Sequence, residues 1–162
     1  MGQYTRVIHL FLGTKAQVIK TAPVVWELER RGIPYRLIDA GQHAELTSRL
    51  RKELQIREPD FCLRNGSDLT SIPSGLGWIG RWLTKGAVQP AWIRSQIFAG
   101  QGGICLVHGD TASAWLGGWL AKRAGLKVAH LEAGLRSFHS LSPFPEELCR
   151  WRTSRRADLL LA

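Results

Sequence analysis

Cysteine is scarce in this sequence, and its few copies lie far apart. Only three cysteines occur among 162 residues, at Cys62, Cys105 and Cys149. There is no CxxC pair and no cluster of cysteine with histidine, so neither a disulfide framework nor a zinc site is expected. Scattered thiols of this kind are typical of reducing compartments. We therefore expect a cytoplasmic protein.

Long hydrophobic runs are also missing. No window of about 18 uncharged apolar residues occurs, so a transmembrane helix is not expected. The apolar run near the N-terminus lacks a small-residue cleavage site and continues into a strand-like pattern, which argues against a signal peptide. Internal repeats and low-complexity tracts are absent as well. With 44% hydrophobic and 22% charged residues, the composition is that of one ordinary globular domain.

Acidic residues are in short supply. The sequence has 13 Asp and Glu residues against 22 Lys and Arg residues, which gives a formal net charge of +9. Such an excess indicates an anionic partner: a nucleic acid, a membrane surface or a phosphorylated small molecule. Composition does not distinguish among these three.

The seven tryptophans and one arginine run bear on that choice. Tryptophan can stack on nucleic-acid bases, but Trp78 and Trp82 are four residues apart, as are Trp115 and Trp119. Helical spacing favours packing in a core or at a domain interface. The arginines of segment 150–156 suit a solvated helix face or a surface that meets another domain. A nucleic-acid partner is therefore not expected.

Short apolar segments alternate with segments of helical periodicity. Strands are predicted at 6–12, 35–40, 104–108, 126–132 and 158–162. Helices are predicted at 15–31, 43–54, 111–124 and 146–156, with one or two more within 68–101 and loops at 57–67 and 134–145. Pro23 lies inside the first helix and is expected to kink it or to begin its second part. This alternation predicts an α/β fold: a Rossmann-like parallel sheet with helices on both faces.

Glycine and polar residues follow four of the predicted strands, in segments 13–15, 41–43, 108–111 and 132–136. Ligands of open parallel sheets bind beyond the carboxyl ends of the strands, so these segments form the candidate site. Most have a structural alternative. The Gly13 turn could bind an anion at a helix N-terminus or only make a tight turn, and Asp110 could cap the next helix. His108 could be a core histidine, as expected for His9 and His130.

The acidic residues near the end of the chain are harder to explain structurally. Glu132 ends an apolar strand, where a partly buried carboxylate is costly. Burial would raise its pKa and suit it to acid–base chemistry, unless Arg136 holds it ionised as a structural pair. Glu146 and Glu147 begin a helix, where the dipole favours acids. They could also supply a third carboxylate to the same cleft.

Five motifs together resemble the non-hydrolysing UDP-N-acetylglucosamine 2-epimerases. They are GTKAQVIKTAP (13–23), GQH (41–43), VHGDT (107–111), HLEAGLRS (130–137) and SPFPEELCR (142–150). Their order and spacing are those of the family. The HGDT and EAGLR pair is the most specific, and the resemblance is weakest over 62–103.

The resemblance implies a glycosyltransferase-B-like architecture, with two Rossmann-like domains and the active site between them. Residues 1–162 would form the N-terminal domain, and the C-terminal domain that grips most of the UDP would be absent from this chain. The abrupt end after an apolar strand agrees with that expectation. The implied full-length protein is a homodimer without a metal or cofactor.

The implied reaction interconverts UDP-GlcNAc and UDP-ManNAc. UDP leaves as the C2 proton is lost, 2-acetamidoglucal forms, and re-addition gives the opposite C2 configuration. The family's acidic catalytic positions correspond to Asp110, Glu132 and Glu146, and its phosphate-side cations correspond to Lys15 and Lys20. Coupled acids titrate together, so the base and the acid are not assigned among the three. The other substrate contacts are expected at Gly13, Gln42, His43, His108 and Arg136.

Some residues depart from the family pattern GTRPEA. Lys15 replaces an arginine and loses its bidentate geometry, Gln17 replaces an acid, and Ala44 follows His43 where the family has arginine. In bacterial members of the family that it resembles, this region contributes to a regulatory UDP-GlcNAc site, so such regulation is not expected here. Two alternatives therefore stay open: a hydrolysing epimerase that releases ManNAc, and a nucleotide-sugar-binding module without turnover.

Overall fold

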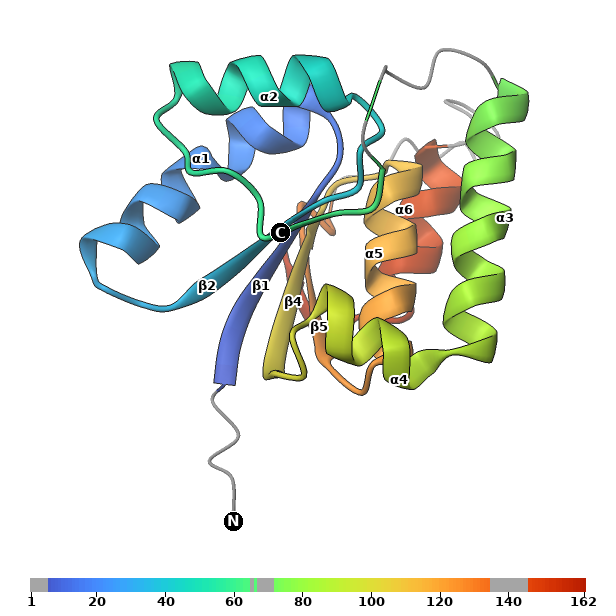
Figure 1. Ribbon diagram of the computed structural model, residues 1–162. Helices are drawn as coiled ribbons and strands as arrows, with labels where there is room; N and C mark the ends of the chain where they lie inside the picture. Colours follow the sequence, from blue (N-terminus) through green and yellow to red (C-terminus); the bar gives the residue numbers. More distant parts are fainter. Residues whose placement is uncertain (1–5, 65, 67–71, 135–145) are drawn as a thin grey trace.

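The sheet of this protein has six parallel strands. The computed structural model describes residues 6–64, 66, 72–134 and 146–162 (Figure 1). The strands are β1 (Arg6–Leu12), β2 (Tyr35–Asp39), β3 (Phe61–Cys62), β4 (Gly102–His108), β5 (Lys127–Leu131) and β6 (Leu159–Leu161). They lie in the order β3-β2-β1-β4-β5-β6, and every neighbouring pair is parallel. The predicted α/β fold is confirmed.

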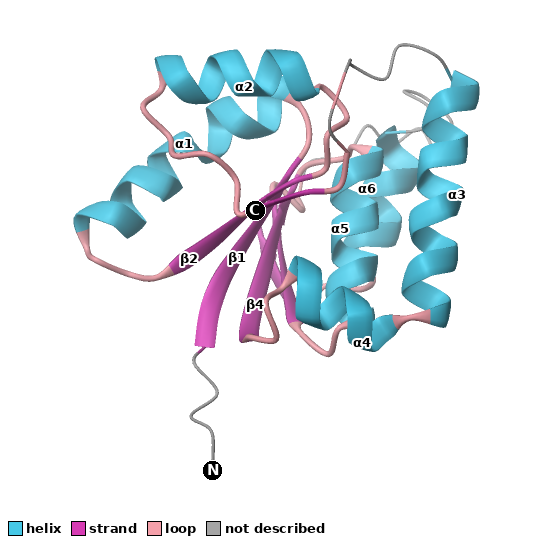
Figure 2. Ribbon diagram, in the orientation of Figure 1, coloured by secondary structure: helices cyan, strands magenta, loops and turns pink. Residues whose placement is uncertain are grey.

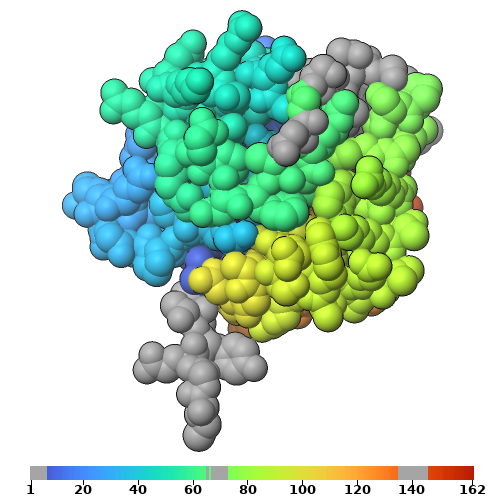
Figure 3. Space-filling view, in the orientation of Figure 1, coloured from blue at the N-terminus to red at the C-terminus, as the bar shows by residue number. Residues whose placement is uncertain are grey.

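Helices cover both faces of the sheet (Figure 2). The elements are α1 (Lys15–Arg30), α2 (Ala44–Glu53), α3 (Ile72–Val88), α4 (Pro90–Trp92), the π-helix η1 (Ile93–Ile97), α5 (Ala112–Arg123) and α6 (Glu146–Ser154). Helices α1 and α2 lie on one side, and α3, α5 and α6 lie on the other. On the face in Figure 3, α2 and the chain leading to β3 lie beside α3 and α4. Among the described residues, none of the helices has the length and hydropathy needed to cross a membrane.

Alternation along β1 builds a separate core on each face. Leu10 and Leu12 pack with Val18 and Val25 of α1, while Phe11 belongs to the cluster on the other face. A Cβ placed on Gly117 of α5 would lie 2.4 Å from the Phe11 ring, so glycine there lets α5 approach the sheet closely. The strand order reverses between β1 and β4, which is where open α/β sheets hold their ligands.

The structure adds detail where the sequence pattern was weak. The predicted loop 57–67 contains β3, a strand of only two residues that periodicity cannot reveal. Pro23 does not divide the first helix, because α1 runs without a break across it. The interpretation of Trp78 and Trp82 as core residues is confirmed, since both are buried. The leucines of β6, at the described edge of the sheet, are exposed.

Candidate active site

Gly13 lies where three elements converge. A Cβ at this position would be 2.8 Å from the Cβ atoms of both Ala40 and Ser113, which is closer than packed carbon atoms approach. The residue therefore lets the turn after β1 pack against the end of β2 and the start of α5. This is the tight-turn alternative of the sequence analysis, and it brings Lys15 to the carboxyl edge of the sheet.

The turn after β1 is closed by a capping box at the start of α1. Thr14 Oγ1 accepts from the backbone N–H of Gln17 at 3.4 Å, and Gln17 Oε1 accepts from the N–H groups of Gly13 at 2.8 Å and Thr14 at 3.1 Å. An anion site at this helix start was the other alternative for the Gly13 turn. The N–H groups of Gly13 and Thr14 are not free for an anion, because the Gln17 side chain occupies both donors.

The turn after β4 carries Asp110. Thr111, and not Asp110, is the N-cap of α5, and its hydroxyl accepts from the Ala114 N–H at 3.2 Å. The capping alternative for Asp110 is therefore wrong. Its carboxylate forms an ion pair with Arg150 of α6, which also contacts Glu147 at 3.3 Å. Helix α6 is thereby attached to the end of β4.

Glu132, Lys20 and His108 form a charged cluster past the ends of β4 and β5. Lys20 Nζ donates to both carboxylate oxygens of Glu132, at 2.7 and 2.8 Å. His108 Nε2 lies 3.7 Å from Glu132 Oε1. Glu132 itself adopts a positive φ of 58°, an uncommon conformation for a residue with a side chain.

Of the two alternatives for the Glu132 carboxyl, the pKa favours the ionised one. Partial burial alone would raise this pKa, but the Lys20 hydrogen bonds and the charges of His108 and Arg150 together hold it below its usual value. The cation that stabilises the carboxylate is thus Lys20, on α1, and the expected Arg136 lies outside the described residues. Burial lowers the pKa of His108, and the Glu132 carboxylate opposes that shift only in part.

Glu146 begins α6 on the same side as Asp110. Burial raises the pKa of Cys149 to about 11, and the charges of Glu146 and Asp110 add to this shift, which places both near that thiol. Within the described part of the chain, Glu146 Oε2 is buried without a hydrogen-bond partner. An unpaired buried oxygen of this kind is costly unless a ligand or proton satisfies it.

The turn after β2 contains Gln42 and His43. The backbone N–H of His43 donates to Gly13 O at 3.1 Å, which joins this turn to the one after β1. Gln42 Oε1 and His43 Nδ1 are buried and have no partner among the described residues. Gln42 Oε1 can therefore accept a hydrogen bond from a ligand, and His43 Nδ1 can accept or donate one according to its tautomer.

Two histidines inside strands are structural, as the sequence analysis expected. His130 is fully buried, and its Nε2 donates to Gly109 O at 2.7 Å. His9 is also fully buried, with its ring edge-on to Phe98 at a centroid distance of 5.2 Å. Burial lowers the pKa of His9 to about 4, so this histidine is neutral near pH 7.

Comparison with known proteins identifies the family to which this chain belongs. A model of the UDP-N-acetylglucosamine 2-epimerase family matches residues 27–162. The chain belongs to this family. This confirms, at the level of the family, the resemblance that the five motifs carried.

Relatives within the epimerase family match nearly the whole chain. The UDP-N-acetylglucosamine 2-epimerase of Methanococcus maripaludis is 32% identical over 157 residues, which cover 96% of this chain and 38% of that protein. The enzyme of Bacillus subtilis is 33% identical over 156 residues, covering 93% and 37%. The crystal structure of UDP-GlcNAc 2-epimerase from Neisseria meningitidis bound to UDP-GlcNAc has a TM-score of 0.75 and 27% identity, covering 98% of this chain and 40% of that one. The chain thus spans about two fifths of the length of these relatives.

Two contacts at the candidate site were missed in the sequence. Arg150 was assigned to a helix surface, although its position four residues after Glu146 puts both on one helix face. Gln17 was noted only as a departure from the family pattern. It is 2% exposed and contacts two strand-end turns. The bonds of Gln17 to Gly13 and Thr14 follow the Thr-x-x-Gln spacing of a capping box, which local sequence does show. The contacts of Gln17 with His108 and of Arg150 with Asp110 are not visible there, because these partners are distant in the chain.

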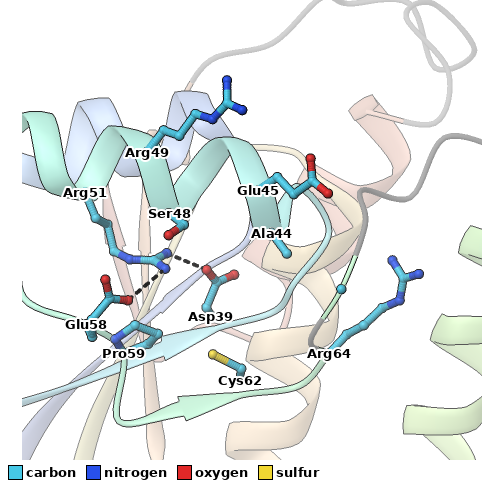
Figure 4. Close-up of a pocket in the computed structure, with 11 residues that line it drawn as sticks. Asp39, Ala44, Glu45, Ser48, Arg49, Arg51, Glu58, Pro59, Cys62 and Arg64 are labelled. Atoms are coloured by element: carbon cyan, nitrogen blue, oxygen red, sulfur yellow. Dashed lines mark hydrogen bonds and ion pairs between the residues drawn. The ribbon is translucent and has the colours of Figure 1, made fainter.

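A separate cavity of about 630 Å³ lies between α2 and β3 (Figure 4). At its base, Arg51 donates to Asp39 at 2.5 Å, and both side chains are only 6% exposed. Arg49 points away from this pair, and Cys62 faces it from β3. The three predicted catalytic carboxylates do not line this cavity.

Across the described residues, no group of three or more His, Cys, Asp and Glu side chains is arranged to hold a metal ion.

Proposed function

We propose that residues 1–162 form the N-terminal Rossmann-like half of a UDP-N-acetylglucosamine 2-epimerase. A second, C-terminal domain would grip the UDP, and the full-length protein would act as a homodimer without a metal or cofactor. Support for a missing half is that the chain spans 38% of the length of a relative that it matches over 96% of its own. The isolated chain is expected to be inactive, because one wall of the interdomain site is absent. Three free thiols agree with a cytoplasmic enzyme.

The proposed reaction begins with UDP-GlcNAc. A carboxylate removes the proton from C2 while the C1–O bond to the diphosphate breaks and a second group protonates the leaving phosphate. This step yields 2-acetamidoglucal and UDP. Reprotonation of C2 on the opposite face and re-addition of UDP at C1 give UDP-ManNAc. Such chemistry needs a base, an acid and cations at the phosphate.

One observation carries this proposal: acidic side chains with cationic partners gather past the ends of β4 and β5. Glu132 is held by Lys20, and Asp110 is held by Arg150. With Glu146 they are the proposed catalytic carboxylates. An incoming diphosphate would compete for Lys20, so substrate binding would release Glu132 for proton transfer. Lys15 would supply the second phosphate-side cation.

The remaining proposed substrate contacts surround these groups. Gln42 and His43 each bring a buried polar atom without a partner in the described part of the structure. His108 lies beside Glu132, and Gly13 sets the turn that carries Lys15. Arg136 stays a proposal from the family resemblance alone.

The test is to incubate the full-length gene product with UDP-GlcNAc in D₂O and follow the sugar by NMR. We expect UDP-ManNAc with deuterium at C2, because the proton is exchanged during epimerisation. Asp110→Asn should lower kcat by about 100-fold or more. Asp158→Asn is the matched control. Asp158 pairs with Lys122 and directly precedes β6, so it lies at the amino end of that strand, whereas the candidate site lies past the carboxyl ends of the strands.

Each other outcome has a defined reading. Free ManNAc with UDP would identify a hydrolysing epimerase. UDP-GlcNAc binding without turnover would identify a nucleotide-sugar-binding module. If the wild-type protein neither binds nor converts UDP-GlcNAc and releases no glucal, the proposal is wrong.

A further inference from the structure

The side-chain amide of Gln17 uses both of its polar atoms fully. Its Nε2 donates to His108 O at 2.8 Å and to Thr111 Oγ1 at 2.9 Å. Its Oε1 accepts from the N–H groups of Gly13 and Thr14 and from Ser113 Oγ at 3.2 Å. An amide offers two donors and two lone pairs. Both donors are used, and three donor groups share the two lone pairs, so no hydrogen-bonding capacity of the amide is left over.

These contacts join two turns that are about 90 residues apart in sequence but adjacent in space, since β1 pairs with β4 (Figure 1). On one side, the oxygen holds the turn that leads directly into Lys15. On the other side, the nitrogen holds His108 and Thr111, the two residues that flank Gly109 and Asp110. The amide therefore fixes both ends of the short segment that carries Asp110.

That segment is also held from β5. The Gly109 N–H donates to Leu131 O at 3.0 Å, and His130 Nε2 donates to Gly109 O at 2.7 Å. Gly109 has a positive φ of 72°, so the turn is sharp and its direction depends on these anchors. With β5 on one side and Gln17 on the other, the backbone that carries the Asp110 carboxylate is held in place.

A carboxylate of the same shape could keep the bonds that Oε1 accepts, but it could not make the two bonds that Nε2 donates. An ionised glutamate only accepts hydrogen bonds, so it would leave His108 O without its donor and place two oxygens against each other. A protonated glutamate would recover one of the two donors. The network therefore depends on an amide, and not only on a side chain of this size.

We propose that Gln17 is a positioning residue that fixes the Asp110 turn relative to the Lys15 turn through its side-chain amide. This inference rests on the proposed epimerase function, because the two turns carry a proposed catalytic carboxylate and a proposed phosphate-side cation. Small displacements of catalytic groups lower the reaction rate strongly, so an amide that sets their spacing affects kcat.

The test compares Gln17→Glu, Gln17→Ala and a control, Val25→Ala, in the full-length gene product. Val25 lies on the same helix and is fully buried in the α1 core, so its truncation lowers stability without touching either turn. Melting temperature, kcat and KM for UDP-GlcNAc are measured from pH 5.5 to pH 8.5, each relative to wild type at the same pH.

For Gln17→Glu we expect kcat about tenfold below wild type at pH 8, and a smaller defect at pH 6. The sign follows from burial: the new carboxyl has a raised pKa in the folded state, so its stabilising protonated form is lost as pH rises. The melting temperature should show the same trend. Gln17→Ala should be impaired equally across the pH range, and Val25→Ala should lose melting temperature with kcat near wild type.

Two results would overturn the inference. One is a Gln17→Glu protein with the wild-type pH profile. The other is a kcat loss no larger than that of Val25→Ala at equal loss of melting temperature. A wild-type protein without turnover contradicts the proposed function instead, and the pH dependence of melting then still decides whether the amide joins the two turns.

Discussion

Arg150 binds Asp110 across 40 positions of sequence and ties helix α6 to the end of strand β4. The arginine side chain is 12% exposed, and it also contacts Glu147 one helical turn earlier. One guanidinium thus connects the helix that bears Glu146 with the turn that bears Asp110. The relative placement of two proposed catalytic carboxylates depends on this contact.

Replacing Arg150 with methionine should therefore weaken both the fold and the reaction. We expect the free energy of unfolding to fall by about 2 kcal/mol, because hydrogen bonds to charged groups are lost in a poorly hydrated place. Urea denaturation of the full-length protein measures this change. Arg152→Met is the control, since Arg152 is exposed on the same helix. Equal losses in the two variants would contradict the structural role of Arg150, and Arg150→Lys should recover only part of the loss.

The Lys20–Glu132 pair should make a small contribution to the free energy of unfolding, and this contribution should be lost at low pH. The pKa of Glu132 is lowered in the folded protein from a reference of 4.5. Its stabilising effect is therefore present above that value and is lost as pH falls through the lower folded-state pKa. Because Lys20 is 50% exposed and Glu132 is 32% exposed, Lys20→Met should cost only about 0.5 kcal/mol at pH 7.

The sharper measurement for this pair is the carboxyl titration of Glu132 followed by NMR. In Lys20→Met we expect the Glu132 pKa to rise toward the usual value. A matched variant, Lys122→Met, removes a cation from a different pair and should leave this titration unchanged. A Glu132 pKa that is the same with and without Lys20 would show that another group lowers it.

Substitution by alanine should change the stability of the fold in opposite directions at Gly13 and at Gly80. At Gly13 the added methyl group meets two Cβ atoms at 2.8 Å, so Gly13→Ala should destabilise the fold by about 1–3 kcal/mol. At Gly80 in helix α3 the added Cβ meets no neighbour within 4 Å, so Gly80→Ala should stabilise by about 0.5–1 kcal/mol through helix propensity. Thermal melting distinguishes the two, and a neutral Gly13→Ala would show that the junction can open.

The sequence was sufficient for the elements that depend on local pattern. Strands such as β1 and β4 are apolar and end at glycine or at a polar turn, so both their place and the site at their carboxyl ends were predictable. The two-residue strand β3 has no such pattern. The cation that pairs with Glu132 could not be predicted, because Lys20 lies 112 positions away and no local spacing reveals that contact.

Side-chain conformation explains the other differences. A helix start preceded by glycine normally offers free N–H groups, so an anion site was one of two interpretations of the Gly13 turn. Gln17 folds back and takes the donors of Gly13 and Thr14 in a capping box, for which the spacing of Thr14 and Gln17 is typical. Its further bond to His108 O, 91 positions away, is not fixed by local sequence.

The exposed leucines of β6 have a practical consequence for work with this segment. Leu159, Leu160 and Leu161 are 47%, 55% and 39% exposed on a strand at the described edge of the sheet. Edge strands with apolar side chains readily recruit further strands from other molecules. A preparation of residues 1–162 alone should therefore self-associate with increasing concentration, and Leu160→Lys should keep it monodisperse.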